Sequence, residues 1–141
     1  MMMFAEVGLR VKDLSKMVAF YQEMLGFEID MTLDSVVFLK VGELPSPLGE
    51  AGHPQLLALF SRDTTLDVGL STLDHLAFEI PREQYDAELA RFQALGMVIR
   101  ERTWPDSLLW RGRSFFFRDP EGNVIELIAP LAKRENAALV D

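Results

Sequence analysis

Three side chains of the kinds that bind cations or move protons stand within short apolar runs of this sequence. Glu6, His75 and Glu126 each alternate with apolar neighbours. Because successive side chains of a strand point to opposite faces, each should lie on the face away from those neighbours. These three residues are therefore the first candidates for chemistry. The alternative for Glu6 is a solvated charge near the start of a strand, and His75 and Glu126 also have purely structural interpretations.

A second group of residues has the composition of a small-molecule pocket, which is mostly apolar with a few polar groups. Ala58 and Phe60 alternate with buried-type positions in one apolar run. Trp104, Trp110, Arg111 and Arg113 lie between two expected strands, and an arginine there can bind a carboxylate or phosphate through two hydrogen bonds. The tryptophans could equally belong to the core or to a dimer interface.

The elements that must position these residues are read from hydrophobic periodicity. The first half shows a strand, a helix that Asp13 or Ser15 can cap, and a helix end at Gly26. The second half repeats this order and ends its helix at Gly96. The expected strands are residues 4–11, 27–29, 36–41 and 55–60 in the first half and 73–80, 97–99, 114–118 and 123–128 in the second, with helices at about 13–25 and 81–95.

The two halves are similar enough to predict a duplication. Leu25-Gly26-Phe27 matches Leu95-Gly96-Met97, and the segment at Glu6 matches the segment at His75, at an offset of about 70 residues. The sequence predicts an α+β domain over 1–141, with a βαβββ module at 4–61, a linker at 62–72, a second module at 73–129 and a tail at 130–141. Residues 119–122 should form a turn, and the long loop 42–54, which contains His53, could act as a lid.

Composition excludes several classes of function. The net charge is −8, and the arginines at 100, 102, 111, 113 and 118 are interleaved with acidic residues, so we expect them to be structural or ligand-facing and expect no nucleic acid. Cysteine is absent, which excludes disulfides, zinc–thiolate sites and a cysteine nucleophile. Neither a signal peptide nor a membrane span is predicted, so we expect a cytoplasmic protein.

Two motifs resemble the vicinal-oxygen-chelate superfamily, which contains glyoxalases, bleomycin-resistance proteins and extradiol dioxygenases. They are Phe20-Tyr21 before Leu25-Gly26-Phe27, and the phrase DPEGNVIEL from Asp119 to Leu127. The resemblance covers about residues 4–129 and implies paired modules whose sheets curl into a cleft with helices outside. It also implies a divalent metal on the floor of the cleft, and commonly a homodimer.

The resemblance places the metal ligands at Glu6, His75 and Glu126, with Ala58 at the fourth corresponding position. Many members have histidine where this chain has Glu6. One histidine with two carboxylates favours Mn²⁺, Mg²⁺ or Zn²⁺ and makes iron chemistry less favoured, while Ni²⁺ also stays open. A carboxylate such as Glu126 could also shuttle a proton, which would make it catalytic.

Two functions follow from this resemblance. One is a metal-dependent enzyme, of lyase, isomerase or dioxygenase type, which chelates a small oxygenated metabolite. The other is a metal-free protein that binds and sequesters a drug or metabolite. His75 and Glu126 favour the enzyme, whereas Glu6 and Ala58 favour the binding protein.

Overall fold

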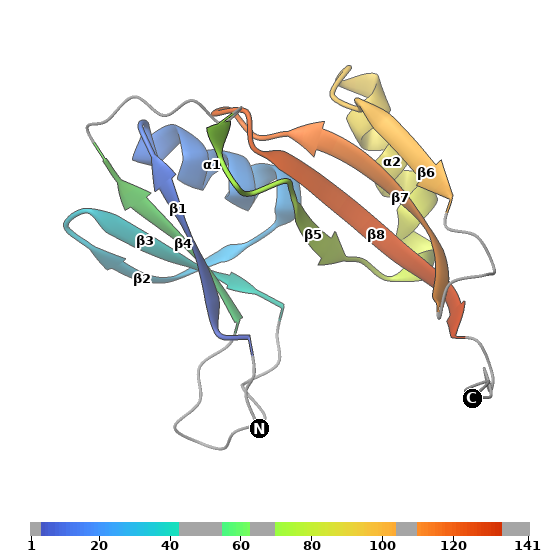
Figure 1. Cartoon of the computed structure of the whole chain (residues 1–141), viewed down its shortest axis with the longest axis horizontal. Helices are drawn as coiled ribbons and strands as arrows, with labels where there is room; N and C mark the ends of the chain where they lie inside the picture. The colour runs from blue at the N-terminus through green and yellow to red at the C-terminus, as the bar shows by residue number, and fades with distance from the viewer. Residues whose placement is uncertain (1–3, 43–54, 63–69, 104–109, 134–141) are drawn as a thin grey trace. The chain divides into compact units, whose positions relative to one another are not determined.

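The chain is built from two units, Met1–Asp67 and Val68–Asp141, each with its own sheet. The computed structural model describes residues 4–42, 55–62, 70–103 and 110–133 (Figure 1). Each unit runs strand, helix, strand, strand, strand, and each sheet is mixed and four-stranded. The predicted pair of βαβββ modules is therefore confirmed.

The first unit orders its strands β1-β4-β3-β2. β1 is parallel to β4, and the remaining neighbours are antiparallel. Parallel neighbours need a long connection, which α1, β2 and β3 provide. The elements are β1 (Glu6–Val11), α1 (Leu14–Leu25), β2 (Glu28–Leu33), β3 (Val36–Val41) and β4 (Gln55–Ser61).

Local sequence fixes both ends of α1. The side chain of Asp13 accepts a hydrogen bond from the backbone N–H of Lys16 at 3.0 Å, so Asp13 rather than Ser15 is the cap. Gly26 ends the helix with φ 70°, a left-handed conformation that glycine adopts without a steric cost. Met17 and Tyr21 are fully buried, and α1 contacts β3 and β4. One face of this sheet therefore packs against α1.

The second unit repeats the same topology as β5-β8-β7-β6, again with its first and last strands parallel. A 3₁₀ turn at Arg82–Gln84 leads into its helix. The elements are β5 (Leu76–Glu79), α2 (Tyr85–Ala94), β6 (Arg100–Thr103), β7 (Trp110–Arg118) and β8 (Val124–Lys133).

An aromatic cluster holds α2 against its sheet. The ring of Phe92 lies 4.4 Å from that of Phe117 and 5.3 Å from that of Phe115, and all three side chains are fully buried. Tyr85 contacts Phe115 at 5.7 Å. Because side chains alternate along a strand, Phe116 belongs to the opposite face. We call these the α2 face and the Glu126 face of the second sheet.

The turn between β7 and β8 is built around a buried aspartate. Asp119 is 4% exposed, and its Oδ1 accepts hydrogen bonds from the backbone N–H groups of Glu121 and Asn123, each at 3.0 Å. Asn123 donates its side-chain amide to Oδ2 at 2.7 Å, and Gly122 has φ 92°. The predicted turn is confirmed, and much of the DPEGN motif serves to build it.

Some expected boundaries in the second unit were wrong. β7 begins at Trp110 rather than Ser114, so Trp110, Arg111 and Arg113 lie within this strand and not before it. A register shift between Arg111 and Gly112 interrupts the alternation of side chains, so periodicity did not predict the first part of this strand. β8 continues to Lys133, into the expected tail, and β5 begins at Leu76, one residue after His75.

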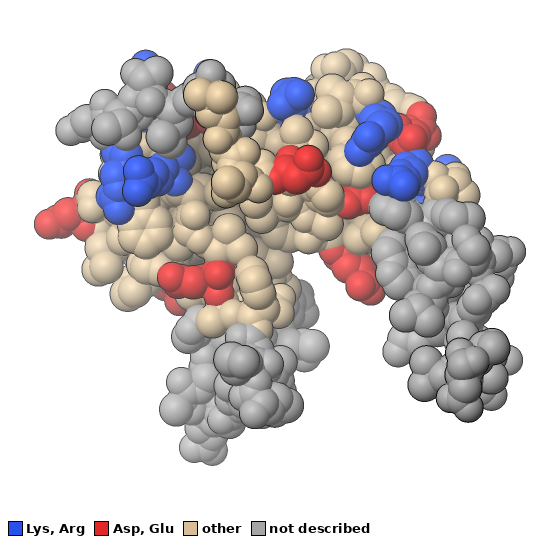
Figure 2. Space-filling model, in the orientation of Figure 1, with Lys and Arg blue, Asp and Glu red and all other residues tan. Residues whose placement is uncertain are grey.

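Charges of both signs lie on the described surface that Figure 2 shows. Basic and acidic side chains are interspersed on the side that Figure 2 shows, and the described residues there form no continuous basic surface. Across the same described ranges, neither helix is long and apolar enough to span a membrane.

Candidate metal and substrate site

A row of four paired positions crosses the second sheet at Glu126. Ala77 on β5 pairs with Glu126 on β8, Glu126 pairs with Phe116 on β7, and Phe116 pairs with Arg100 on β6. Directly paired residues share a face, so all four side chains belong to the Glu126 face. His75 enters the same face from the residue position two before Ala77. The site therefore has an acid, an imidazole, an aromatic ring and a guanidinium on neighbouring strands.

His75 and Glu126 are in direct contact. Nε2 of His75 lies 3.2 Å from Oε2 of Glu126, and Glu126 is 2% exposed. The His75 ring also meets the edge of the Phe116 ring, with centroids 5.8 Å apart. Two of the three predicted ligands are therefore brought together within one unit.

The second nitrogen of His75 has its own carboxylate. Nδ1 lies 2.6 Å from Oδ2 of Asp74, whose side chain is almost wholly exposed. A carboxylate that accepts the Nδ1 proton leaves Nε2 as the lone-pair nitrogen, which is the form in which imidazole binds a metal. Asp74 thus orients Nε2 toward Glu126. Asp74 was not among the site residues predicted from the sequence, although its position next to His75 was the available signal.

The donor atoms of this pair fit a divalent cation. Oε1 of Glu126 is buried and has no hydrogen-bond partner among the described residues. Leaving a buried acceptor unpaired costs about 1–3 kcal/mol. A cation between Nε2 of His75 and the two oxygens of Glu126 would satisfy all three acceptors at once. Imidazole and carboxylate together suit Mn²⁺, Zn²⁺ and Fe²⁺.

Glu6 occupies the corresponding place in the first unit. Gly8 pairs with Ala58 as Ala77 pairs with Glu126, so Glu6 stands two positions before the pair as His75 does. The duplication thus places Glu6 and His75 at equivalent sites of the two sheets. Among the described residues, no cluster of three or more His, Asp or Glu side chains could hold a metal. Glu6 as a third ligand remains a prediction.

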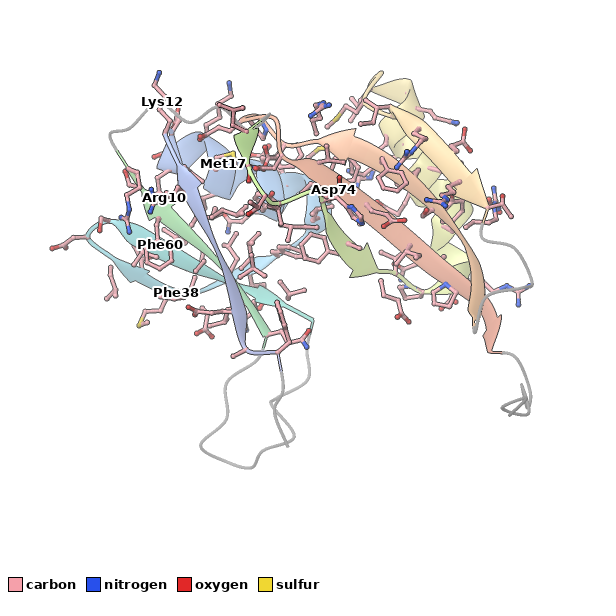
Figure 3. All side chains as sticks on the ribbon, viewed as in Figure 1. Arg10, Lys12, Met17, Phe38, Phe60 and Asp74 are labelled. Carbon is pink, nitrogen blue, oxygen red and sulfur yellow. The ribbon has the colours of Figure 1, made fainter. Side chains whose placement is uncertain are left out.

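The predicted pocket residues of the first unit lie beside an aromatic pair. Ala58 is fully buried, and the Phe60 ring packs edge-on against Phe38 with centroids 6.2 Å apart (Figure 3). Gly8 leaves room for this ring, because a Cβ there would lie 3.1 Å from Phe60. Ala58, Phe38 and Phe60 therefore form an apolar surface, on the sheet face opposite α1.

Arg113 is engaged on the other side of the second sheet from Glu126. Its guanidinium bonds to Asp86 at 2.9 Å and stacks over Tyr85 at 4.4 Å, on the α2 face. Burial raises the pKa of Tyr85 above its ordinary value, against the lowering effect of Arg113. Arg113 on β7 thus stabilises the packing of α2 against that strand.

The side chains of Trp104, Trp110 and Arg111, and the loop with His53, lie outside the described residues.

The fold is a duplicated βαβββ unit, in which the imidazole of His75, just before β5, lies beside the buried carboxylate of Glu126 on β8. The chain belongs to the Glyoxalase/Bleomycin resistance protein/Dioxygenase superfamily, whose family model matches residues 4–127. The predicted superfamily is therefore confirmed.

Individual relatives support the same placement. The chain is 28% identical over 127 residues to the glutathione transferase FosA of Serratia marcescens, covering 89% of this chain and 80% of that protein. It is similar to the fosfomycin resistance protein FosX of Listeria monocytogenes, with TM-score 0.65, 28% identity, and coverage of 92% and 93% of the two chains. A lactoylglutathione lyase of Agrobacterium tumefaciens matches with TM-score 0.63 and 25% identity, over 90% and 92% of the chains.

Proposed function

We propose that this protein is a divalent-metal-dependent enzyme that acts on a small oxygenated substrate, with His75 and Glu126 as metal ligands. The observation that carries the proposal is the buried Glu126 carboxylate, which has one oxygen 3.2 Å from Nε2 of His75 and the other without a hydrogen-bond partner in the described part of the chain. A structural ion pair would leave no acceptor unsatisfied, whereas a metal site needs free acceptors.

The relatives support the same assignment. FosX of Listeria monocytogenes has been crystallised with Mn(II) and sulfate, and that structure matches this chain at TM-score 0.62 and 26% identity. A bound divalent ion would act as a Lewis acid on chelated substrate oxygens. Within this chain, Asp74 orients His75, and the buried surroundings of Glu126 exclude water from its carboxylate. Glu6 is the proposed third ligand.

Isothermal titration of chelator-stripped protein with Mn²⁺ tests the metal site. Wild type should bind Mn²⁺ with micromolar or tighter affinity, and His75→Ala and Glu126→Gln should each lose most of it. The matched control is His53→Ala, which removes the other of the two histidines. If folded wild type binds neither Mn²⁺ nor Zn²⁺, the metal-dependent function is wrong and the ligand-sequestering function takes its place.

The homodimer and the cytoplasmic location remain predictions. Light scattering on the eluting protein should give about twice the chain mass of 16.0 kDa if the dimer forms. A mass equal to one chain across a micromolar concentration range would contradict it.

A further inference from the structure

Three contacts restrain the His75 ring. Its Nδ1 lies 2.6 Å from Asp74 and its Nε2 lies 3.2 Å from Glu126. The third contact is the Phe116 ring, with centroids 5.8 Å apart and an interplanar angle of 74°, which is the T-shaped geometry that aromatic rings favour. The side chain of His75 is 36% exposed, so the ring has room to turn toward solvent unless these contacts hold it.

The three contacts differ in how firmly they hold the ring. Asp74 directs Nε2 toward Glu126, but its own side chain is 95% exposed, so it restrains the ring less firmly than a buried group would. A bound cation would lie between His75 and Glu126 and replace their direct contact. Phe116 is 2% exposed and belongs to β7, which pairs with a strand on each side. Close packing keeps such a side chain in one rotamer, with or without a cation.

Phe116 is buried by the site rather than by the core under α2. The preceding residue, Phe115, packs on Phe92 of α2 with centroids 5.3 Å apart. Phe116 lies on the opposite face, where it pairs directly with Glu126 and where the guanidinium carbon of Arg100 lies 4.2 Å from its centroid. One strand therefore supplies two adjacent buried aromatic side chains, one in the core and one against the proposed ligands.

We propose that Phe116 is a positioning residue, which holds the imidazole of His75 in the orientation that directs Nε2 toward Glu126. This inference rests on the proposed function, since it concerns how the same two ligands are arranged before a divalent cation binds. An imidazole that is already ordered loses little rotamer freedom when the cation binds, whereas a mobile one loses that freedom at the binding step. Removing the Phe116 ring should therefore weaken metal binding through His75.

The test compares Phe116→Leu with Phe115→Leu in chelator-stripped protein. NMR relaxation of the Cε1–Hε1 group measures the order of the His75 ring, and His53→Ala assigns its resonance because the chain has two histidines. Phe116→Leu should lower the order of the His75 ring and lower the Mn²⁺ affinity about three- to tenfold. Phe115→Leu should lose comparable stability, since both rings are buried, yet keep the ring order and Mn²⁺ affinity of wild type.

An unchanged order of the His75 ring in Phe116→Leu, an equal loss of order in Phe115→Leu, or a wild-type Mn²⁺ affinity in Phe116→Leu would overturn the proposal. Phe116→Met, a smaller loss of volume, gives the same comparison if the leucine variant does not fold. The relaxation measurement needs no metal and is therefore separate from the proposed function. If the ring order falls in Phe116→Leu but wild type binds no Mn²⁺, the positioning of His75 stands and the metal-dependent function fails.

Discussion

Nε2 of His75 and Oε2 of Glu126 lie 3.2 Å apart, where His75 directly precedes β5 and Glu126 pairs with Ala77 of that strand. The carboxylate is buried and the imidazole is partly exposed. A cation entering from solvent would therefore meet the imidazole and then the carboxylate. This contact makes metal binding and stability testable separately.

Replacing Glu126 with methionine should stabilise the metal-free protein. The substitution keeps the side-chain length and removes a buried oxygen that has no hydrogen-bond partner among the described residues. We expect the free energy of unfolding to rise by about 1–2 kcal/mol while Mn²⁺ no longer raises it. Urea denaturation with and without Mn²⁺ measures both effects. The control Glu79→Met, at an exposed position on β5, should leave both unchanged, and a clear loss of stability in Glu126→Met would contradict the prediction.

Asp74→Ala should weaken Mn²⁺ binding without weakening the fold. Asp74 fixes the orientation of His75 through a 2.6 Å contact, but its exposed side chain adds little packing. Loss of a carboxylate that orients a ligand histidine typically lowers metal affinity about 10–100-fold. Because the Asp74 side chain is exposed to solvent, we expect its loss to lower the Mn²⁺ affinity about tenfold. Calorimetry measures the affinity. Asp86→Ala, at another exposed aspartate of the same unit, should bind Mn²⁺ normally.

Asp119→Ala should destabilise the second unit by about 2–4 kcal/mol, since it removes three hydrogen bonds from a buried turn. Asp119→Asn keeps an oxygen for the two backbone donors and should cost less. Thermal denaturation of the two variants measures the difference. Equal losses would show that the charge of Asp119, rather than its hydrogen bonds, stabilises the turn.

Tyr85 should make the protein sensitive to alkaline pH. Burial raises its pKa above 10.0 in the folded state, so folding favours the neutral phenol. The stability from this group is fully present below pH 10 and is lost as the pH rises through the raised value. Wild type should therefore lose stability faster than Tyr85→Phe above pH 10. Parallel pH dependences of the two proteins would contradict this account.

The sequence was sufficient for the duplicated fold because both signals are local. Alternation defines the strands, and Gly26 and Gly96 adopt the positive φ that their helix ends require. The same alternation predicted the sheet face on which Glu126 lies. The strand register pairs Glu126 with Ala77 and Phe116 on that face. Periodicity failed at Trp110–Gly112, where the register shift breaks the alternation.

The contacts that give the site its chemistry depend on strand pairing, which one sequence does not specify. Arg100 and Phe116 are direct partners only because β6 and β7 pair in this register. Arg113 was predicted at the pocket from its residue type, yet it lies on the α2 face with Asp86. In both cases the residue type was informative, and the face on which it lies came from the structure.

The central claim, that His75 and Glu126 hold a divalent ion, is tested most directly by electron spin-echo spectroscopy of the Mn²⁺-loaded protein. The account predicts a coupling to one imidazole nitrogen, which persists in His53→Ala and disappears in His75→Ala. Bound Mn²⁺ without nitrogen coupling, or with a coupling that survives His75→Ala, would show that the ion binds elsewhere and would contradict the site described above.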